Sequence, residues 1–159
     1  MRKQLLMGLL FSILLLGCTS SPQATKQIAF YLNSKSDNQN NLSHAIYTYD
    51  DDNELVSAKI KVTYSGLKTT LSNNTLFDQY RTLVNLYDGL EGVKVTLKPK
   101  TDGYEYQEKW DFQKVNVTKM VNLDERQQVF VKDNQYNLNK IKTYYQKQGY
   151  SVDEKELKD

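Results

Sequence analysis

Three acidic residues, Glu105, Glu108 and Asp111, stand close together in a segment rich in aromatic residues. Paired carboxylates are the acid and base of glycoside hydrolases, so this group suggests a cell-wall-active hydrolase. Alternation along a strand, however, places Glu105 and Asp111 on one face together with Lys109. That arrangement is typical of a solvated ladder of charges. The spacing therefore gives little support to Glu105 and Asp111 as a catalytic pair.

Glu108 falls on the opposite face of the same predicted strand, among aromatic side chains. An acid there either lies near the open end of the sheet or pairs with a cation, because an unpaired buried charge is costly. The aromatic stripe of this face could stack on sugars or peptide, or it could pack as core beneath helices. The stripe consists of Tyr104, Tyr106, Trp110 and Phe112, with Tyr47, Tyr49 and Tyr64 from earlier strands. We take Tyr104, Tyr106, Glu108 and Trp110 as the possible ligand or partner surface.

Residues suited to nucleophilic or metal chemistry are scarce. His44 is the only histidine and Cys18 the only cysteine, and no G-x-S-x-G motif is present. A polar residue at the start of a strand is the simpler interpretation of His44, and one histidine cannot provide the usual zinc ligands. Residues 50–54 are rich in acids but lack the spacing and glycine of an EF-hand, which favours a hairpin tip. We expect no catalytic set, no metal site and no cofactor.

Cys18 has a different significance, because it follows Leu15-Leu16-Gly17 at the end of an apolar run. This pattern is that of a bacterial lipobox, in which the cysteine sulfur receives a thioether lipid and a small residue precedes the cleavage site. The run from 5 to 16 is shorter than the roughly 20 residues of a membrane-spanning helix and is preceded by positive charge. We therefore expect residues 1–17 to be a signal peptide, with an uncleaved anchor as the alternative. Cys18 would become the acylated, palmitate-bearing first residue.

The predicted anchor fixes the compartment and the organisation of the chain. Two acyl chains give lasting attachment, so we expect an extracytoplasmic domain anchored to the cell membrane through Cys18. Without Arg2 and Lys3 the basic residues only balance the 19 acidic ones, which makes nucleic acid an unexpected partner. The predicted organisation is a lipidated cysteine and flexible tether over 18–27, one domain over 28–152 and a fraying charged tail over 153–159.

Hydrophobic periodicity indicates strands interrupted by two helices. Alternation is clearest from Val56 to Ser65, the second arm of a hairpin whose turn is 50–53. Apolar residues at helical spacing end at Gly89 and again at Gly149, where glycine is suited to a helix stop. The order β-β-β-α-β-β-α predicts an α+β fold, an antiparallel meander with two helices on one face. The expected strands are 28–33, 43–49, 56–65, 93–98 and 104–112; the expected helices follow Ser72-Asn73 and span 137–148; residues 34–41 are an expected loop; and 115–131 are ambiguous between a short helix and a short strand.

Three features together resemble the YehR-like family of small bacterial lipoproteins. These are the lipobox, the segment YDGLEGVKVTLKPKTDGYEYQEKWDF from Tyr87 to Phe112, and the closing segment LNKIKTYYQKQGY from Leu138 to Tyr150. The resemblance covers about residues 45–150 and implies a fold and an extracytoplasmic location. The family has no assigned activity, so the resemblance carries over no functional residues.

The sequence favours a non-catalytic binding or protein-interaction module of the cell envelope. The expected partners are the membrane, through Cys18, and an envelope protein, a peptide or a wall component. Two alternatives stay open. One is a wall-active hydrolase that uses carboxylates such as Glu108, and the other is a carrier with a small-ligand pocket between helices and sheet.

Overall fold

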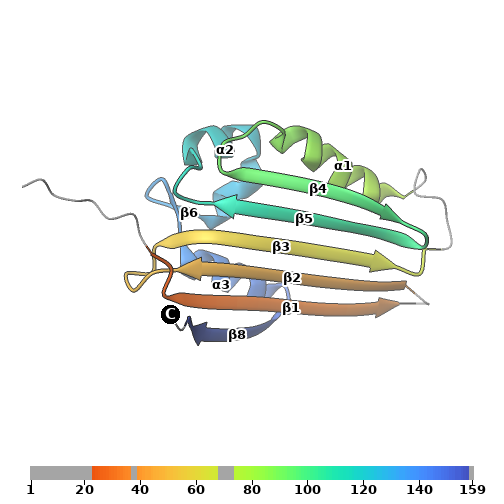
Figure 1. Cartoon of the computed structure of the whole chain (residues 1–159), viewed down its shortest axis with the longest axis horizontal. Helices are drawn as coiled ribbons and strands as arrows, with labels where there is room; N and C mark the ends of the chain where they lie inside the picture. Colours follow the sequence, from red (N-terminus) through yellow and green to blue (C-terminus); the bar gives the residue numbers. More distant parts are fainter. Residues whose placement is uncertain (1–22, 37–38, 68–73, 158–159) are drawn as a thin grey trace, which may run out of the picture.

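The protein is built on one six-stranded antiparallel sheet, as the computed structural model of the chain shows (Figure 1). The structure describes residues 23–36, 39–67 and 74–157. The strands lie in the order β4-β5-β3-β2-β1-β8, and the helices gather on one face. The predicted α+β fold is confirmed. The strands are β1 (Lys26–Ser36), β2 (Gln39–Tyr49), β3 (Leu55–Ser65), β4 (Val93–Lys100), β5 (Gly103–Asp111) and β8 (Ser151–Glu156), with a small hairpin of β6 (Val131–Lys132) and β7 (Gln135–Tyr136); the helices are α1 (Thr75–Tyr87), α2 (Val117–Leu123), the 3-10 helix η2 (Glu125–Phe130) and α3 (Leu138–Lys147).

The hairpin of β2 and β3 forms around the predicted acidic turn. Asp50 accepts hydrogen bonds through Oδ1 from the backbone nitrogens of Asp52, at 3.0 Å, and Glu54, at 2.8 Å. Asn53 adopts a positive φ of 65°, which asparagine tolerates better than most residues. The acids of residues 50–54 therefore shape a hairpin tip, as the turn propensities of Asp and Asn predict.

The chain takes a different path through the sheet from a simple meander. After β3, helix α1 carries the chain over the face of the sheet to β4 at its edge, and β5 returns between β4 and β3. Register then pairs Ala58 with Trp110 and Ile60 with Glu108. Because side chains opposite each other across a sheet point the same way, the alternating residues of β3 and β5 form one continuous face.

The two ends of the domain also differ from the prediction. Lys26 and Gln27 belong to β1, and the Thr25 nitrogen donates to the Tyr49 carbonyl at 3.0 Å, so the predicted tether over 18–27 is too long. The predicted charged tail is wrong up to Glu156, because residues 151–156 form β8 against β1. An edge strand can be fully exposed and charged, as β8 is, since its backbone hydrogen bonds need no apolar side chains.

Strand pairing likewise extends into the segment expected as a loop. β1 continues to Ser36 and β2 begins at Gln39, so every described residue of the predicted 34–41 loop belongs to one of these two strands. The side chains from Lys35 onward are polar and give no apolar alternation. Their backbone groups nevertheless pair, in register Lys35 with Asn40. Sequence periodicity reports side-chain burial and therefore missed this exposed pairing.

An asparagine caps each of the three α-helices in the described part of the chain. Asn74, Asn116 and Asn137 accept hydrogen bonds from the backbone nitrogens of Phe77, Lys119 and Lys140. The cap of α1 is thus Asn74, one residue after the predicted pair, which lies outside the described residues. A carboxamide oxygen in this position satisfies a backbone donor that the first turn leaves free.

Helices α1 and α3 each end two residues before a glycine, Gly89 and Gly149. These are the predicted stop glycines, and their φ values are +70° and +81°. The ambiguous segment 115–131 forms α2 and η2 and then enters β6, in line with the expectation of a short helix followed by a short strand. None of the described helices is long and apolar enough to cross a membrane.

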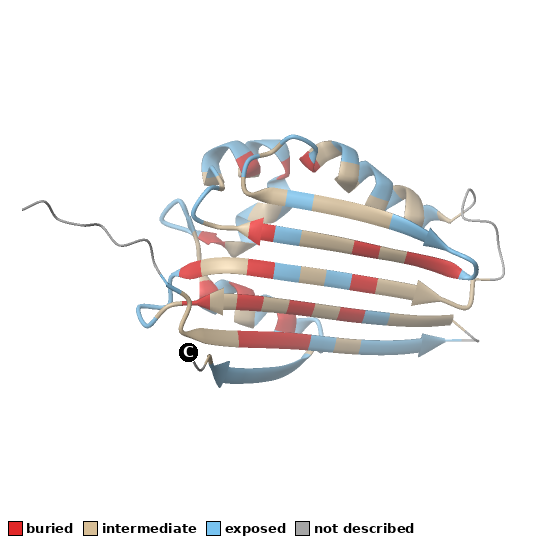
Figure 2. Ribbon diagram, viewed as in Figure 1, coloured by how far each residue is buried: buried red, intermediate tan, exposed pale blue. Residues whose placement is uncertain are grey.

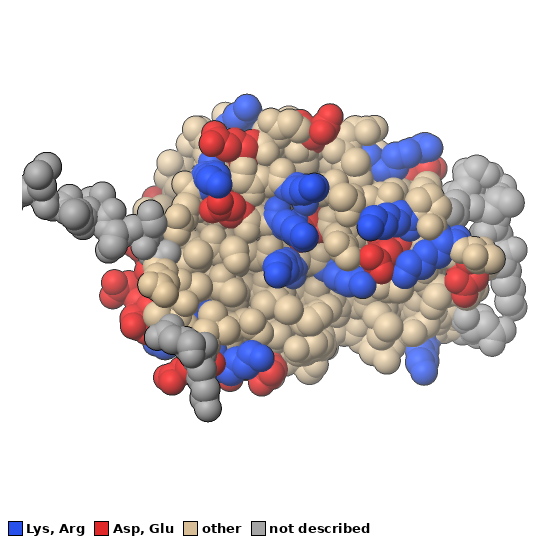
Figure 3. All heavy atoms as spheres, in the orientation of Figure 1, with Lys and Arg blue, Asp and Glu red and all other residues tan. Residues whose placement is uncertain are grey.

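The core lies between the sheet and the helices. Buried residues alternate regularly along β2, whereas three consecutive residues of β1 are buried (Figure 2). The opposite face of the sheet is polar, and lysines gather over β3, β4 and β5 (Figure 3). Lys109 lies in register with Lys59 on one side and Lys94 on the other, forming a row of like charges. Such a row costs stability. One face of the sheet is therefore apolar and covered by helices, whereas the other face is polar and rich in lysine.

Candidate functional site

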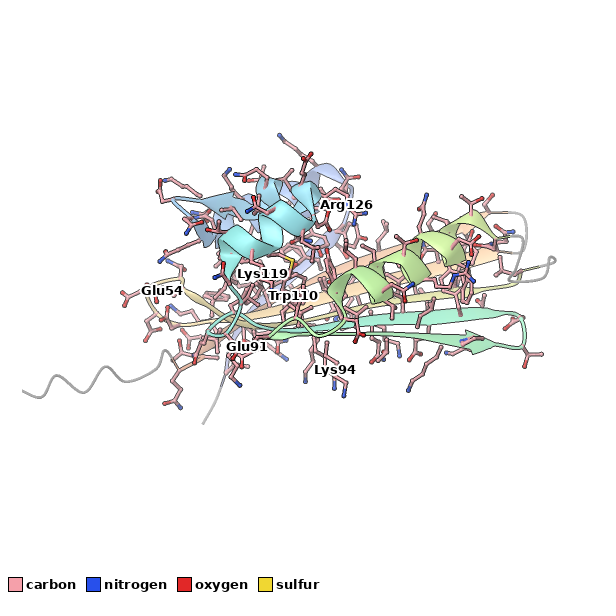
Figure 4. All side chains as sticks on the ribbon, turned by 90° about the horizontal axis from the view of Figure 1, so that it is seen from above. Glu54, Glu91, Lys94, Trp110, Lys119 and Arg126 are labelled. Atoms are coloured by element: carbon pink, nitrogen blue, oxygen red, sulfur yellow. The ribbon has the colours of Figure 1, made fainter. Side chains whose placement is uncertain are left out.

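A cavity of about 210 Å³ lies between the inner face of the sheet and the helix layer. Trp110 points from the sheet towards the helices, whereas Lys94 points away from them (Figure 4). The cavity is partly open to solvent, and its lining includes Tyr144, which is 39% exposed and forms part of its rim. Its lining combines the aromatic Tyr47, Tyr80, Tyr106, Trp110, Phe112, Phe130, Tyr136, Tyr144, Tyr145 and Tyr150, the aliphatic Ile60, Val62 and Ile141, and the polar Ser43, Glu108 and Gln127.

The floor of the cavity comes from the aromatic stripe of β5 and its neighbours. Tyr80 of α1 lies over Tyr106, with ring centroids 4.3 Å apart. Trp110 contacts Phe112 at 5.9 Å and Tyr136 at 5.8 Å, in a stacked and a T-shaped arrangement respectively. Rings at these distances support one another and limit the rotation of their neighbours. The floor is consequently a continuous surface of packed rings.

The roof comes from the C-terminal part of the chain. Tyr145 of α3 reaches the sheet, where its hydroxyl lies 3.2 Å from that of Tyr47. Tyr144 contacts Phe130 of η2 at a ring distance of 4.9 Å, and Tyr150 contacts Tyr145 at the same distance. The helical spacing of residues 137–148 predicts that Tyr144 faces inward together with Ile141 and Tyr145. That prediction is wrong for Tyr144, because its ring lies at the surface of α3 and not in the core.

Glu108 is the only acid among the lining residues. Its Oε1 accepts a hydrogen bond from the Tyr106 hydroxyl at 2.5 Å, and its Oε2 accepts one from the Trp110 indole nitrogen at 2.7 Å. Both donors lie two residues away on the same face of β5, as the period of a strand requires. The carboxylate has no ion pair within the described part of the chain. Of the two predicted surroundings, the open end of the sheet or a cation, the cation is therefore wrong, and two neutral donors contact the carboxylate.

Burial raises the pKa of Glu108 above its ordinary value, and the two hydrogen bonds oppose this effect. The residue keeps some accessible surface because it borders the cavity, while its carboxylate is withdrawn from bulk water. Burial likewise raises the pKa of Tyr80, to about 12, and the charge of Glu108 adds to the shift. Burial is also the main cause of the raised pKa values of five further rings, and the charge of Glu108 makes a smaller contribution to each: Tyr47, Tyr87, Tyr106, Tyr136 and Tyr145.

A second buried acid, Asp124, does not line the cavity, and its negative charge is paired with a cation. The Arg126 guanidinium donates to it through Nε at 2.7 Å and through Nη2 at 2.8 Å, and the Tyr87 hydroxyl also donates to it. Gln127 donates to the Tyr87 hydroxyl at 3.0 Å and accepts from Tyr136 at 3.2 Å. These contacts join α1, η2 and β7 and hold the wall in place. The sequence offered no signal for them beyond the adjacent charges of Asp124 and Arg126.

The structure brings three of the four predicted surface residues into the cavity. Tyr106, Glu108 and Trp110 line it, whereas Tyr104 is 0 % exposed and lies outside it. Tyr104 is covered by α1, with the Phe77 ring 5.5 Å away, and its hydroxyl finds no partner among the described residues. Two residues along a strand are a shift of about 7 Å, which is enough to pass from the cavity to the space beneath the helix.

The other residues that the sequence singled out for catalysis, metal binding or lipidation lie outside the cavity or outside the described part of the chain. His44 lies within β2 on the outer face, stacked on Tyr31 with ring centroids 4.3 Å apart, and burial lowers its pKa. Glu105 pairs on that face with Lys61 and Lys100, both at 3.0 Å. Across the described residues, no group of three or more His, Cys, Asp or Glu side chains could hold a metal ion. Cys18 lies outside the described residues.

Comparison with known proteins supports the fold and gives no activity. The NMR structure of the E. coli YehR protein has a TM-score of 0.54 at 13% identity, over 88% of this chain and 96% of that one. An NMR structure of a protein from Streptococcus pneumoniae TIGR4 has a TM-score of 0.50 at 18% identity, over 96% and 97%. No curated protein matches.

These likenesses confirm the expected resemblance to the YehR-like family at the level of the fold. Lipoprotein processing stays a prediction. The family described as "Domain of unknown function (DUF8824)" matches residues 19–158, and the chain therefore belongs to this family.

Proposed function

We propose that the protein is a lipid-anchored, extracytoplasmic and non-catalytic binding domain that holds a small ligand in the aromatic cavity. The cavity itself carries this proposal. Stable cores are packed with few voids larger than a water molecule, so an open space of about 210 Å³ beside a buried acid is not needed for folding. A site with ring walls and few polar groups is typical of small-molecule binding.

The surroundings of Glu108 favour binding over hydrolysis. Hydrolysis by paired carboxylates needs a second acid on the other side of the substrate. Glu105 and Asp111 face away from the cavity, and both oxygens of Asp124 are engaged by Arg126. Glu108 thus stands alone among the lining residues. A single carboxylate in a cage of rings is suited to orienting a bound group.

The anchor is proposed from the lipobox at Cys18. The first paired residue of the sheet is Thr25, so at most about 25 Å of chain separates the cysteine from the domain. Two acyl chains on Cys18 would hold the domain beside the membrane, where the ligand or its donor would be found. Loss of fatty-acid labelling and of membrane fractionation in Cys18→Ala would support this part of the proposal. Unchanged labelling would contradict it.

Filling the cavity tests ligand binding directly. We expect Ile60→Trp to place an indole in the cavity and to abolish binding of small probe molecules to the lipidated protein in nanodiscs. Saturation-transfer NMR with a mixed set of neutral, anionic and cationic fragments would measure this. Lys59→Trp is the matched control, because the neighbouring residue carries the same new ring on the outer face.

In the wild-type protein and in Lys59→Trp, fragments should bind with similar signals. Equal binding by Ile60→Trp would show that the probes use another surface. If no fragment of any class bound the wild-type protein, the proposal of a ligand-binding domain would be wrong.

A further inference from the structure

We infer that the cavity is a binding site for a small organic cation, an alkylammonium group held by the Glu108 carboxylate and enclosed by aromatic rings. This inference rests on the proposed ligand-binding function and names the chemical class of its ligand. It follows from three observations: the buried Glu108 has no ion pair among the described residues, aromatic rings surround it, and no basic residue lines the cavity.

The first observation is that Glu108, a buried acid, has no ion pair within the described part of the chain. Asp124 is paired with Arg126 at 2.7 Å, and Glu154, at the sheet edge, is paired with Lys142 at 2.9 Å. Glu108 receives only two neutral hydrogen bonds, although a carboxylate offers about four acceptor positions. Its free acceptor capacity is therefore available to a group that enters the cavity, and a positive group would compensate its charge.

The second observation is that rings surround this carboxylate. Tyr106 and Trp110 donate to it, and Tyr80 lies over the Tyr106 ring. Tyr136 and Tyr145 line the same cavity. Burial is the main cause of the raised pKa of each ring hydroxyl, and the charge of Glu108 is among the smaller contributions. Ring faces carry partial negative charge and attract cations within about 6 Å, with tryptophan the strongest. Carboxylate and ring faces therefore favour the same sign of ligand.

The third observation is that the cavity has no basic residue in its lining. No lysine, arginine or histidine is among the residues that line the cavity, so an anionic ligand would meet Glu108 without a basic side chain to contact. The volume of about 210 Å³ is below the range of roughly 300–1,000 Å³ that is common for drug-sized ligands. A head group of a few heavy atoms fits this space. A neutral polyol is the main competitor, because its hydroxyl groups can donate to the carboxylate and its apolar face can stack on rings.

The protein carries its own reporter for the test. Trp110 is the only tryptophan and lies in the cavity, so its fluorescence reports on occupancy directly. The probe is choline, and its matched partner is the uncharged analogue in which carbon replaces the quaternary nitrogen. The two molecules have nearly the same shape. Methyl glucoside represents neutral polyols, and acetate represents anions.

We expect choline to change the Trp110 fluorescence of the full lipidated chain and to bind at least about tenfold more tightly than its uncharged analogue. Glu108→Gln should remove this preference. Glu105→Gln should retain it, because Glu105 is on the outer face of the same strand. The comparison of the two probes in the wild-type protein needs no variant, so it holds even if Glu108→Gln fails to fold.

The other outcomes of this experiment distinguish the proposal of a cationic ligand from the proposal of a ligand-binding function. Equal affinity for choline and its uncharged analogue would overturn the inference of a cationic ligand and leave the binding cavity in place. Binding of methyl glucoside or acetate in preference to choline would do the same. No binding by any of the four probes, together with no fragment binding by NMR, would overturn the ligand-binding function as well.

Discussion

Glu105 and Glu108 belong to the same strand, β5, and face opposite sides of the sheet. Glu105 pairs with Lys61 and Lys100, and these contacts lower its pKa to about 2. Glu108 has no ion pair among the described residues, and burial raises its pKa. Because side chains alternate along a strand, the two acids lie on different faces of the sheet. The helices cover only the face that carries Glu108 and exclude solvent from it.

The comparison extends to whole rows of side chains. On the outer face, the row of Lys59, Lys109 and Lys94 places like charges side by side, and none of the three pairs with an acid in the described part of the chain. On the inner face, rings crowd around one acid. Solvent screens the lysines, whereas it is withdrawn from Glu108. A lone charge inside is therefore more informative about function than several outside.

The largest difference between the faces should appear when neighbouring residues of β5 are truncated. We expect Trp110→Ala to lower the free energy of unfolding by about 3–5 kcal/mol, because it removes a buried ring from the core. Lys109→Ala is the matched control, and its effect should stay within about 0.5 kcal/mol. Urea denaturation followed by circular dichroism measures both. Similar losses in the two variants would contradict the assignment of the faces.

The next largest effect concerns the pH dependence that Glu108 imposes. Because its folded pKa is raised above the ordinary value of 4.5, stability is greatest when Glu108 is protonated and falls as pH rises from about 4.5 through the folded pKa. Each unit of pKa difference corresponds to about 1.4 kcal/mol. Glu108→Gln, whose amide can serve the same two partners, should lose this decline. A wild-type decline that persists in the variant would exclude Glu108 as its source.

Glu105 should give the opposite pH dependence and a smaller effect. Its folded pKa of about 2 lies below 4.5, so its stabilisation is complete above pH 4.5 and disappears as pH falls towards 2. Lys61 and Lys100 are 47% and 45% exposed, so solvent screens these pairs and the effect should stay near 1 kcal/mol or below. Acid titration of Glu105→Gln against wild type, monitored by unfolding, tests the sign. Equal acid sensitivity of the two proteins would contradict it.

The smallest effect is expected from the lysine row. Lys109→Glu would place an acid between Lys59 and Lys94 and should raise stability by about 0.2–1 kcal/mol. Added salt should stabilise the wild-type protein more than the variant, because it screens repulsion in one and attraction in the other. Thermal unfolding at low and high salt measures both effects. A destabilised variant at low salt would show that the lysines have partners other than one another.

The faces of the strands could be read from the sequence, because they depend on local alternation. The alternation in β3 and β5 correctly placed Tyr106, Glu108 and Trp110 together on one face. The same reasoning failed for β8 and for the far ends of β1 and β2. These segments pair through backbone groups at exposed positions, where side chains leave no pattern.

The cavity itself could not be read from the sequence. Its floor comes from strands and its roof from Tyr136, Tyr144 and Tyr145, which are distant along the chain from Glu108. Whether these surfaces are in full contact or leave a space depends on the distance at which α1, η2 and α3 pack against the sheet. No local sequence pattern encodes this distance between the helices and the sheet. The sequence determined that an acid would stand among aromatic rings. Only the tertiary structure decided that it would lack a cation and border an open space.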